Sequence, residues 1–138
     1  MDSKIWGPKL WDSLHAITLN YPDLPTLQDK DNMKQFFNSL GNVLPCHKCK
    51  INFSKHLVTH PLNNDVLSSK TKLVKWLIDI HNEVNIMTGK PIMSYETALK
   101  TILEKYEDNG YGYNVWLLII IVIVFLVIGS VLLCNKYA

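Results

Sequence analysis

An apolar run, VWLLIIIVIVFLVIGSVLLC at residues 115–134, constrains this chain most, because it carries no charged residue. As a helix it would be about 30 Å long, enough to cross the hydrocarbon core of a bilayer. A helix of that length can be fully buried only in a protein much larger than 138 residues. We therefore expect a helical domain at residues 1–107, a linker at 108–114, one C-terminal transmembrane helix at 115–134 and a short tail at 135–138.

The flanks of this run are typical of a membrane anchor. Trp116 lies near one end, and Lys136 and Tyr137 lie beyond the other, where such side chains suit the two interfaces. The opening MDSKIWGPKLWDSLH carries charges and has no apolar stretch of the kind a secretory signal needs. We expect a single-pass membrane protein whose N-terminal domain faces the cytosol.

Residues 1–107 show helical periods and almost no strand alternation. Short connections between amphipathic helices favour antiparallel neighbours. The predicted fold is therefore all-α, a four-helix bundle with a short fifth helix. The predicted helix starts are Pro8, Thr26, Pro45, Ser68 or Ser69, and Ser94, and Gly89 is the predicted stop of the fourth helix.

Composition excludes two classes of protein. The net charge is only +2 and the basic residues are scattered, so no stripe for nucleic acid is present. Three cysteines are too few for the disulfide scaffold of a small secreted domain. One of the three, Cys134, lies at the far end of the apolar run, out of easy reach of the others, where it serves packing or lipidation or is idle.

The other two, Cys46 and Cys49, form a C-x-x-C pair in LPCHKCK, where Pro45 predicts a helix start. With His56 and His60 they give C-x2-C-x6-H-x3-H, which resembles a zinc site. A zinc finger keeps about twelve residues between its second Cys and first His, and six residues of helix would direct His56 away from the sulfurs. We expect the chain's histidines at positions 47, 56 and 60 to lie at the surface.

A structural disulfide and a redox dithiol are the other two interpretations of the pair. A bond across so small a loop removes little entropy from the unfolded chain, and it does not persist in a reducing cytosol. A redox role suits the position better, because a helix N-terminus stabilises the reactive thiolate, and Lys48 and Lys50 add positive potential. Cys46 would be the accessible sulfur and Cys49 the more buried one. The preceding MKQFFNSLGNVL is helical in pattern, which argues against a thioredoxin fold.

Three stretches in this order resemble the Erv/ALR family of FAD-linked sulfhydryl oxidases. They are WGPKLWDSLH, CHKC and WLIDIHNEVNIMTGKPIMSY, and the resemblance covers roughly residues 5 to 106. It implies FAD held within the helical bundle, usually in a homodimer. It also implies that Cys49 is the sulfur next to the flavin and that Cys46 exchanges with the substrate thiol. The cofactor-binding residues implied are Gly7, Trp11, His15, Trp76, His81, Asn82, Val84, Asn85, Lys90 and Tyr95.

The residues themselves partly support this assignment. His81 and Asn85 lie four apart on one helix face with Trp76 close by. Each residue also has a plainer interpretation: Trp76 as core, His15 and His81 as bundle histidines, and Asn82 as a solvated helix residue. No metal is expected at this site.

The resemblance implies an enzyme that makes disulfides in substrate proteins, or in a small dithiol carrier protein. Its electrons would pass through FAD to oxygen and give hydrogen peroxide. The chain lacks the further shuttle cysteine pair that many family members carry. In this it resembles the compact members encoded by large DNA viruses, which suggests a virion or host membrane.

Two other classes stay open. A membrane-anchored helical adaptor would have a zinc-binding or incidental C-x-x-C. A dithiol electron carrier that had lost FAD would have no reason to keep HNEVN together.

Overall fold

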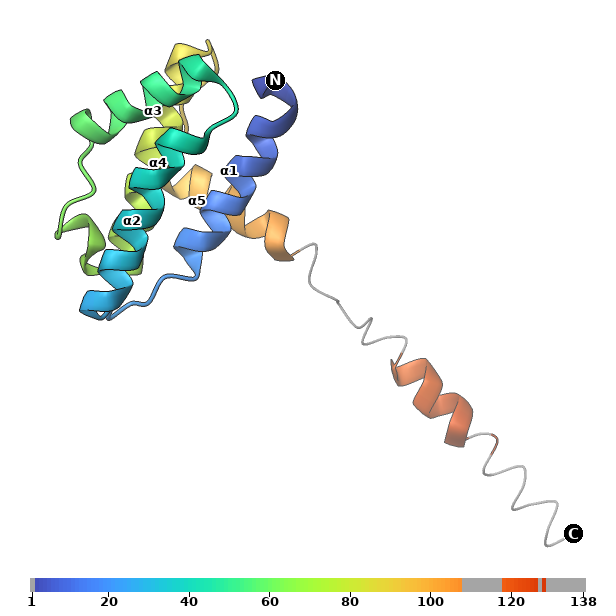
Figure 1. Cartoon of the computed structure of the whole chain (residues 1–138). Coiled ribbons are helices and arrows are strands. Elements are labelled where there is room, and N and C mark those ends of the chain that lie inside the picture. The colour runs from blue at the N-terminus through green and yellow to red at the C-terminus, as the bar shows by residue number, and fades with distance from the viewer. Residues whose placement is uncertain (1, 108–117, 127, 129–138) are drawn as a thin grey trace, which may run out of the picture. The chain divides into compact units, whose positions relative to one another are not determined.

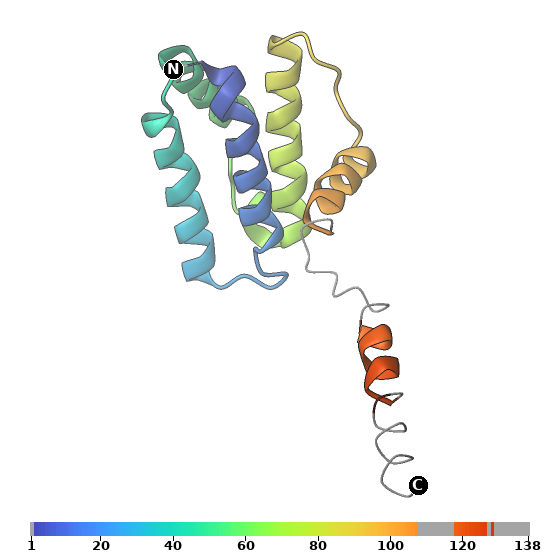
Figure 2. The same cartoon turned by 90° about the vertical axis from the view of Figure 1, so that its right-hand side faces the viewer.

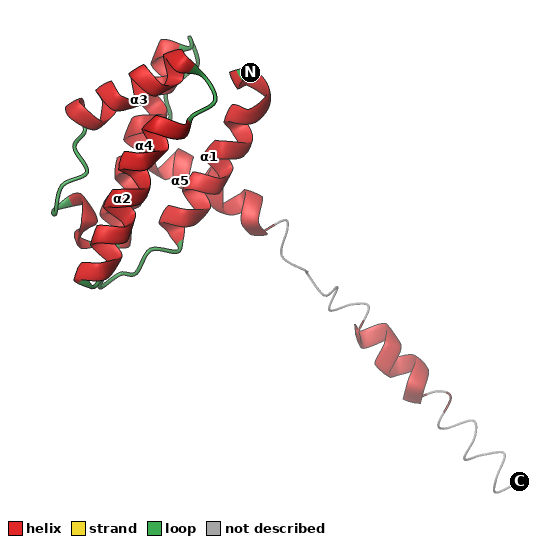
Figure 3. Ribbon diagram, viewed as in Figure 1, coloured by secondary structure: helices red, strands yellow, loops and turns green. Residues whose placement is uncertain are grey.

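The computed structural model describes residues 2–107, 118–126 and 128. The elements in chain order are α1 (Ser3–Leu19), α2 (Leu27–Val43), α3 (His47–Thr59), the 3-10 helix η1 (Val66–Ser68), α4 (Lys70–Met87) and α5 (Tyr95–Glu107). These described residues contain helices and loops and no strand (Figure 3). The all-α class predicted from the sequence is confirmed.

Local capping fixes three of the predicted boundaries. Thr26 and Asp29 form a reciprocal capping box at the start of α2. Ser69 caps α4 by accepting the Lys72 backbone N–H at 3.4 Å. Gly89 follows α4 with φ of +69°, a left-handed conformation that favours glycine and ends the helix. The predicted starts of α2 and α4 and the stop of α4 are therefore confirmed.

The predicted start of the first helix at Pro8 is wrong. Asp2 caps α1 with its carboxylate, which accepts the Lys4 backbone N–H at 2.9 Å, so Pro8 lies inside the helix. Proline removes one helical hydrogen bond and crowds the residue before it. That preceding residue is Gly7, which has no Cβ, and this lessens the crowding.

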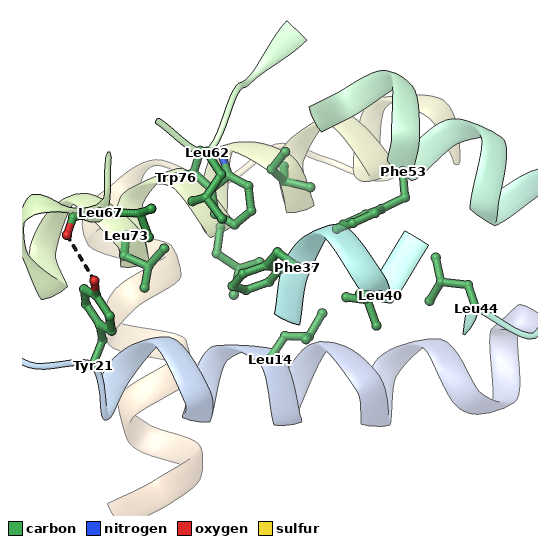
Figure 4. Packing of buried hydrophobic residues seen from close by; sticks show 12 residues of the cluster. Leu14, Tyr21, Phe37, Leu40, Leu44, Phe53, Leu62, Leu67, Leu73 and Trp76 are labelled. Atoms are coloured by element: carbon green, nitrogen blue, oxygen red, sulfur yellow. Dashed lines mark hydrogen bonds between the residues drawn. The ribbon is translucent and has the colours of Figure 1, made fainter. Parts of the chain in front are cut away.

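The main core joins the first four α-helices. Figures 1 and 2 show α1, α2 and α4 running alongside one another, and α3 packs on α2. A cluster of buried side chains lies between these helices (Figure 4). In it the rings of Phe37 and Trp76 pack edge to face, with centroids 4.8 Å apart. Tyr21 closes one end of the cluster by donating a hydrogen bond to the Leu67 carbonyl at 3.0 Å.

A second, smaller cluster joins α5 to another face of α4. Val74, Ile78 and Ala98 are its buried members, and Met93 and Tyr95 pack against them. α4 is therefore buried on two sides. Contacts on both of these faces hold α4 in place, and with it the residues at its C-terminal end.

The predicted anchor falls mostly outside the described residues. Of its twenty positions, 118–126 are helical and the structure describes little else of the segment. Among the residues that are described, no helix is both long enough and apolar enough to cross a membrane. The linker at 108–114 and the tail at 135–138 also lie outside the described residues, so these assignments stay predictions.

Candidate active site

Cys46 and Cys49 are joined by a disulfide at the N-terminus of α3. The predicted start of this helix at Pro45 is wrong, because α3 begins at His47 with Cys46 as its N-cap residue. The Sγ of Cys46 accepts the Cys49 backbone N–H at 3.3 Å. Both cysteines are half-buried, and Cys49 packs against the main core. A sulfur that accepts a helix N-terminal N–H is one whose thiolate form the helix stabilises. The disulfide is thus accessible on one side and supported on the other.

Lysines lie on both sides of Cys49 in the sequence of α3. Lys48 is exposed, and Lys50 donates a hydrogen bond from Nζ to the Asn42 carbonyl at 2.7 Å. That carbonyl belongs to the last turn of α2, so Lys50 satisfies a helix end and holds α3 against α2. α3 carries three lysines and no acidic residue.

The structure brings three of the predicted cofactor residues together. The rings of Trp11 on α1 and His81 on α4 are stacked, with centroids 4.0 Å apart and planes 6° apart. His15 lies beside them, and its Nε2 is 3.1 Å from Nδ1 of His81. This hydrogen bond needs one protonated and one unprotonated nitrogen, so it holds the two rings in complementary tautomers. The two half-buried rings of Trp11 and His81 therefore form a stacked pair between α1 and α4.

Trp76 lies elsewhere in the packing. Only 4% of it is exposed, its ring contacts Phe37, and its indole N–H donates to the His60 carbonyl at 2.9 Å. The plainer interpretation of Trp76 as a core residue therefore describes its contacts in this structure. Its contact with a cofactor stays a prediction.

Asn82 has a structural task. Its amide nitrogen donates to the Met93 carbonyl at 2.9 Å, and its amide oxygen accepts the Met93 N–H at 3.1 Å. Both ends of the side chain therefore fix the segment that follows α4. One further donor position and one further acceptor position remain on the amide. The contact of Asn82 with a cofactor stays a prediction.

The remaining predicted cofactor residues lie near the C-terminal end of α4, at the start of α5 and on α1. Asn85 is buried, and its carbonyl accepts the Lys90 N–H at 2.8 Å, so the exposed Lys90 is held directly beyond the helix end. Val84 is half-buried on α4, and Tyr95 is half-buried in the second cluster. No atom lies within 4 Å of a Cβ built on Gly7, so the space beside it is open.

The surface position expected for His56 is wrong. The residue is only 6% exposed, and its Nε2 is buried with no hydrogen-bond partner among the described residues. Burial lowers the pKa of His56 below its ordinary 6.5; the negative charge of Glu83 opposes this shift, and His60 adds to it. His60 is half-buried, 3.8 Å from the Glu83 carboxylate, whereas His47 is exposed as expected.

Trp6 is a second buried donor that sequence reasoning missed. Its Nε1 has no partner in the part of the chain that the structure describes, although its ring packs against the main core. A buried donor without a partner calls for an explanation, and a bound polar ligand is one. The opening tryptophan of WGPKLWDSLH was the only signal in the sequence.

Comparison with known proteins identifies the family. The model of the Erv1 / Alr family matches residues 8–107, a stretch that holds both cysteines and every predicted cofactor residue except Gly7. The chain belongs to the Erv1 / Alr family.

Relatives in this family include viral proteins. The chain is 45% identical, over 82% of its own length and 81% of the relative's, to a protein of Acanthamoeba polyphaga mimivirus named "Probable FAD-linked sulfhydryl oxidase". It is 30% identical to the FAD-linked sulfhydryl oxidase of African swine fever virus, over 79% of this chain and 88% of that protein.

Solved structures of the family have the same fold. The crystal structure of the FAD binding domain of Erv1 from Saccharomyces cerevisiae superimposes with a TM-score of 0.63 at 34% identity. The match covers 68% of this chain and 87% of that domain. The all-helical arrangement of the described residues is thus an Erv1-like fold.

The lowered pKa of His56 predicts a specific pH dependence of stability. Because burial disfavours the charged imidazole, the unfolded chain binds this proton more tightly than the folded chain does. The free energy of unfolding should therefore fall as the pH drops through 6.5 towards the folded pKa, and His56 contributes its full stabilisation above that range. Urea unfolding of the His56→Gln variant should show a flatter dependence in this window. His47→Gln, at an exposed position, is the control, and an equal slope in wild type and His56→Gln would contradict the prediction.

Proposed function

We propose that this chain is an FAD-linked sulfhydryl oxidase that forms disulfides in protein substrates. The observation that carries the proposal is the Cys46–Cys49 disulfide at the N-terminus of α3, in a chain of the Erv1 / Alr family. Relatives at 45% and 30% identity are named as FAD-linked sulfhydryl oxidases. The final acceptor would be oxygen.

We infer the exchange step from the position of the disulfide at the start of α3 and from the roles that the family resemblance implies for the two cysteines. A substrate thiolate attacks Sγ of Cys46, the S–S bond breaks, and Cys49 leaves as a thiolate. A second substrate thiolate then attacks the substrate sulfur of the mixed disulfide and releases Cys46 as a thiolate. The substrate gains a disulfide and loses two protons and two electrons, and the two electrons reside on the Cys46–Cys49 pair. The helix N-terminus lowers the cost of each thiolate that forms.

The residues present suit a flavin. FAD, when bound, supplies the acceptor for the two electrons and returns them to oxygen with hydrogen peroxide as product. An outer face of the stacked Trp11–His81 pair would offer a flat surface for a planar ring, and Lys90 would offer a cation for phosphate. The partnerless buried nitrogens of Trp6 and His56 would offer hydrogen bonds.

The adaptor alternative has less support. Among the residues that the structure describes, no three histidine, cysteine or acidic side chains lie close enough to hold a metal ion. The named relatives are oxidases, so a zinc-binding or incidental C-x-x-C is not favoured.

We also propose that residues 115–134 anchor the enzyme in a membrane, with the catalytic domain on the cytosolic side. The uncharged run supports this, because each Leu, Ile, Val or Phe at the centre of a span contributes about −0.3 to −0.6 kcal/mol to insertion. Assembly as a homodimer, and a setting in a virion or host membrane, belong to the same proposal. Viral relatives support the setting.

Cysteine variants test the proposed activity. The Cys49→Ser variant should lose oxygen consumption with dithiothreitol by about a hundredfold or more, because the electron pair then has no dithiol to reside on. Cys134→Ser is the matched control and should keep the wild-type rate. The full chain in detergent should also show a two-band flavin spectrum that bleaches with dithiol in the absence of air. A colourless folded protein, or an active Cys49→Ser variant, would refute the oxidase.

Removal of the Trp11 ring tests the proposed cofactor surface. Stacking of an aromatic side chain on a planar base is worth about 1–3 kcal/mol. The Trp11→Ala variant should therefore bind FAD at least several-fold more weakly, measured by flavin fluorescence during titration and by flavin content after purification. Phe36→Ala removes a partly exposed ring on α2 and should bind FAD as the wild type does. Unchanged affinity in a folded Trp11→Ala protein would show that this surface is not the flavin site.

Charge substitutions test the anchor. Aspartate at the centre of a span costs about 2.5–3.5 kcal/mol, so Ile121→Asp with Val124→Asp should release the protein from membranes washed at alkaline pH. Leu24→Asp with Leu27→Asp adds the same charge at exposed sites in the domain and should leave the protein membrane-bound. Release of the wild-type chain by the same wash would contradict the anchor.

A further inference from the structure

A groove lies between the C-terminal end of α2 and the side of α3, apart from the stacked rings of Trp11 and His81. Its volume is about 570 Å³. The site built from Trp11 and His81 lies between α1 and α4, so the groove belongs to different elements. Its walls include Gly41 and Asn42 on α2, and Lys50, Ile51, Lys55 and Val58 on α3.

Close packing of the two helices forms the base of this groove. A Cβ added to Gly41 would meet the Phe53 ring at 3.3 Å and the Ser54 hydroxyl at 3.6 Å. The glycine therefore lets α2 approach α3 closely, and the buried Phe53 fixes α3 to the core. The Lys50 hydrogen bond to the Asn42 carbonyl holds the same two helices together. The groove is a fixed feature of the packing.

One wall of the groove begins one helical turn from the exchanging cysteine. Lys50, Ser54 and Val58 all line the groove and follow one another at intervals of four residues along α3, and the N-cap residue Cys46 precedes Lys50 by four residues. The Lys50 N–H donates to the Cys46 carbonyl at 3.0 Å, which makes Cys46 the head of this row. Twelve residues of helix span about 18 Å, the length of about five residues of extended peptide.

The walls of the groove combine aliphatic surface with unopposed positive charge. Val58 is 81% exposed and Ile51 is 44% exposed, so these two side chains give the groove an aliphatic surface. Lys50 and Lys55 are the charged residues of the lining, and no acidic residue is among them. None of the ion pairs found within the described residues involves either lysine.

We propose that this groove binds an extended, acidic and aliphatic segment of a substrate protein, next to the cysteine that attacks Cys46. The inference rests on the proposed function and specifies its substrate class. Acidic side chains of the segment pair with Lys55 and Lys50, and aliphatic ones cover Val58 and Ile51. The segment brings its cysteine to the head of the row, so that the groove raises the effective concentration of one thiol at the disulfide.

Charge reversal at Lys55 tests this groove in the full chain. The probes are a short peptide with alternating acidic and aliphatic residues before a Cys-Gly-Gly-Cys dithiol, the same peptide with lysines for the acidic residues, and dithiothreitol. The readout is kcat/KM for each peptide divided by kcat/KM for dithiothreitol on the same protein. The Lys9→Glu variant makes the same charge change on the exposed surface of α1 and is the matched control.

In the wild type we expect the ratio for the acidic peptide to exceed that for the basic peptide, and to fall with added salt. Lys55→Glu should lower the ratio for the acidic peptide about fivefold and raise it for the basic peptide, as expected for a surface charge pair that is reversed. Lys9→Glu should change neither. Val58→Ser, which removes aliphatic surface without adding charge, should lower the ratios for both peptides.

Other outcomes separate the two proposals. If the chain oxidises dithiothreitol but Lys55→Glu leaves both peptide ratios unchanged, the groove proposal is overturned and the oxidase stands. If no thiol is oxidised by the flavin-loaded wild type, the proposed function itself fails. If Lys55→Glu alters the oligomeric state in light scattering and not the ratios, the groove is an interface between copies of the chain, and the substrate proposal is overturned.

Discussion

The burial of α4 on two sides is the constraint on which the rest of the structure depends. Leu77 and Ile80 have no exposed surface in the main core, and Val74 and Ile78 are buried against α5. A helix packed on two faces can neither rotate nor slide without opening both contacts. The residues of its next turn, beginning at His81, are therefore held in fixed directions. The site between α1 and α4 takes its precision from apolar packing one turn away.

The disulfide is constrained in a different way, because it needs a fixed orientation and must also be accessible to a thiol of another protein. α3 is fixed through Phe53 in the core and through the bond from Lys50 to the C-terminal turn of α2. Its first turn projects from this support, so the disulfide is half-buried. A fully buried disulfide could not meet a protein thiol, and a fully exposed one would lack a fixed orientation. The N-cap position of Cys46 satisfies both needs, since the helix end that orients the sulfur also stabilises its thiolate.

The helices were predictable wherever a local signal decides a boundary. Thr26 with Asp29, Ser69 and Gly89 each act through their own backbone neighbours, so their effects are written in the sequence. Pro8 led to a wrong prediction of where the first helix starts. Proline prefers the first helical position, but the Asp2 cap begins α1 earlier. The helix continues through Pro8, where the preceding Gly7 lessens the crowding. Asp2 and Pro8 each signal a helix start, and the sequence pattern does not show which of the two begins the helix.

Residue types and spacing indicate candidate site residues, but the contacts of these residues depend on how the helices pack. Helical spacing put His81 near Asn85, but the stacking of Trp11 on His81 depends on how α1 lies against α4. The burial of His56 likewise depends on what covers α3, which no local pattern of that helix reports. Asn82 shows the physical limit most clearly. An asparagine suits a solvated helix position, a cofactor contact and hydrogen bonds to the Met93 backbone equally well. Only the position of the segment that follows α4 shows that this amide bonds Met93. Because that clamp fixes the chain beyond Gly89, Asn82 positions the segment that starts at Lys90, whatever else its amide contacts.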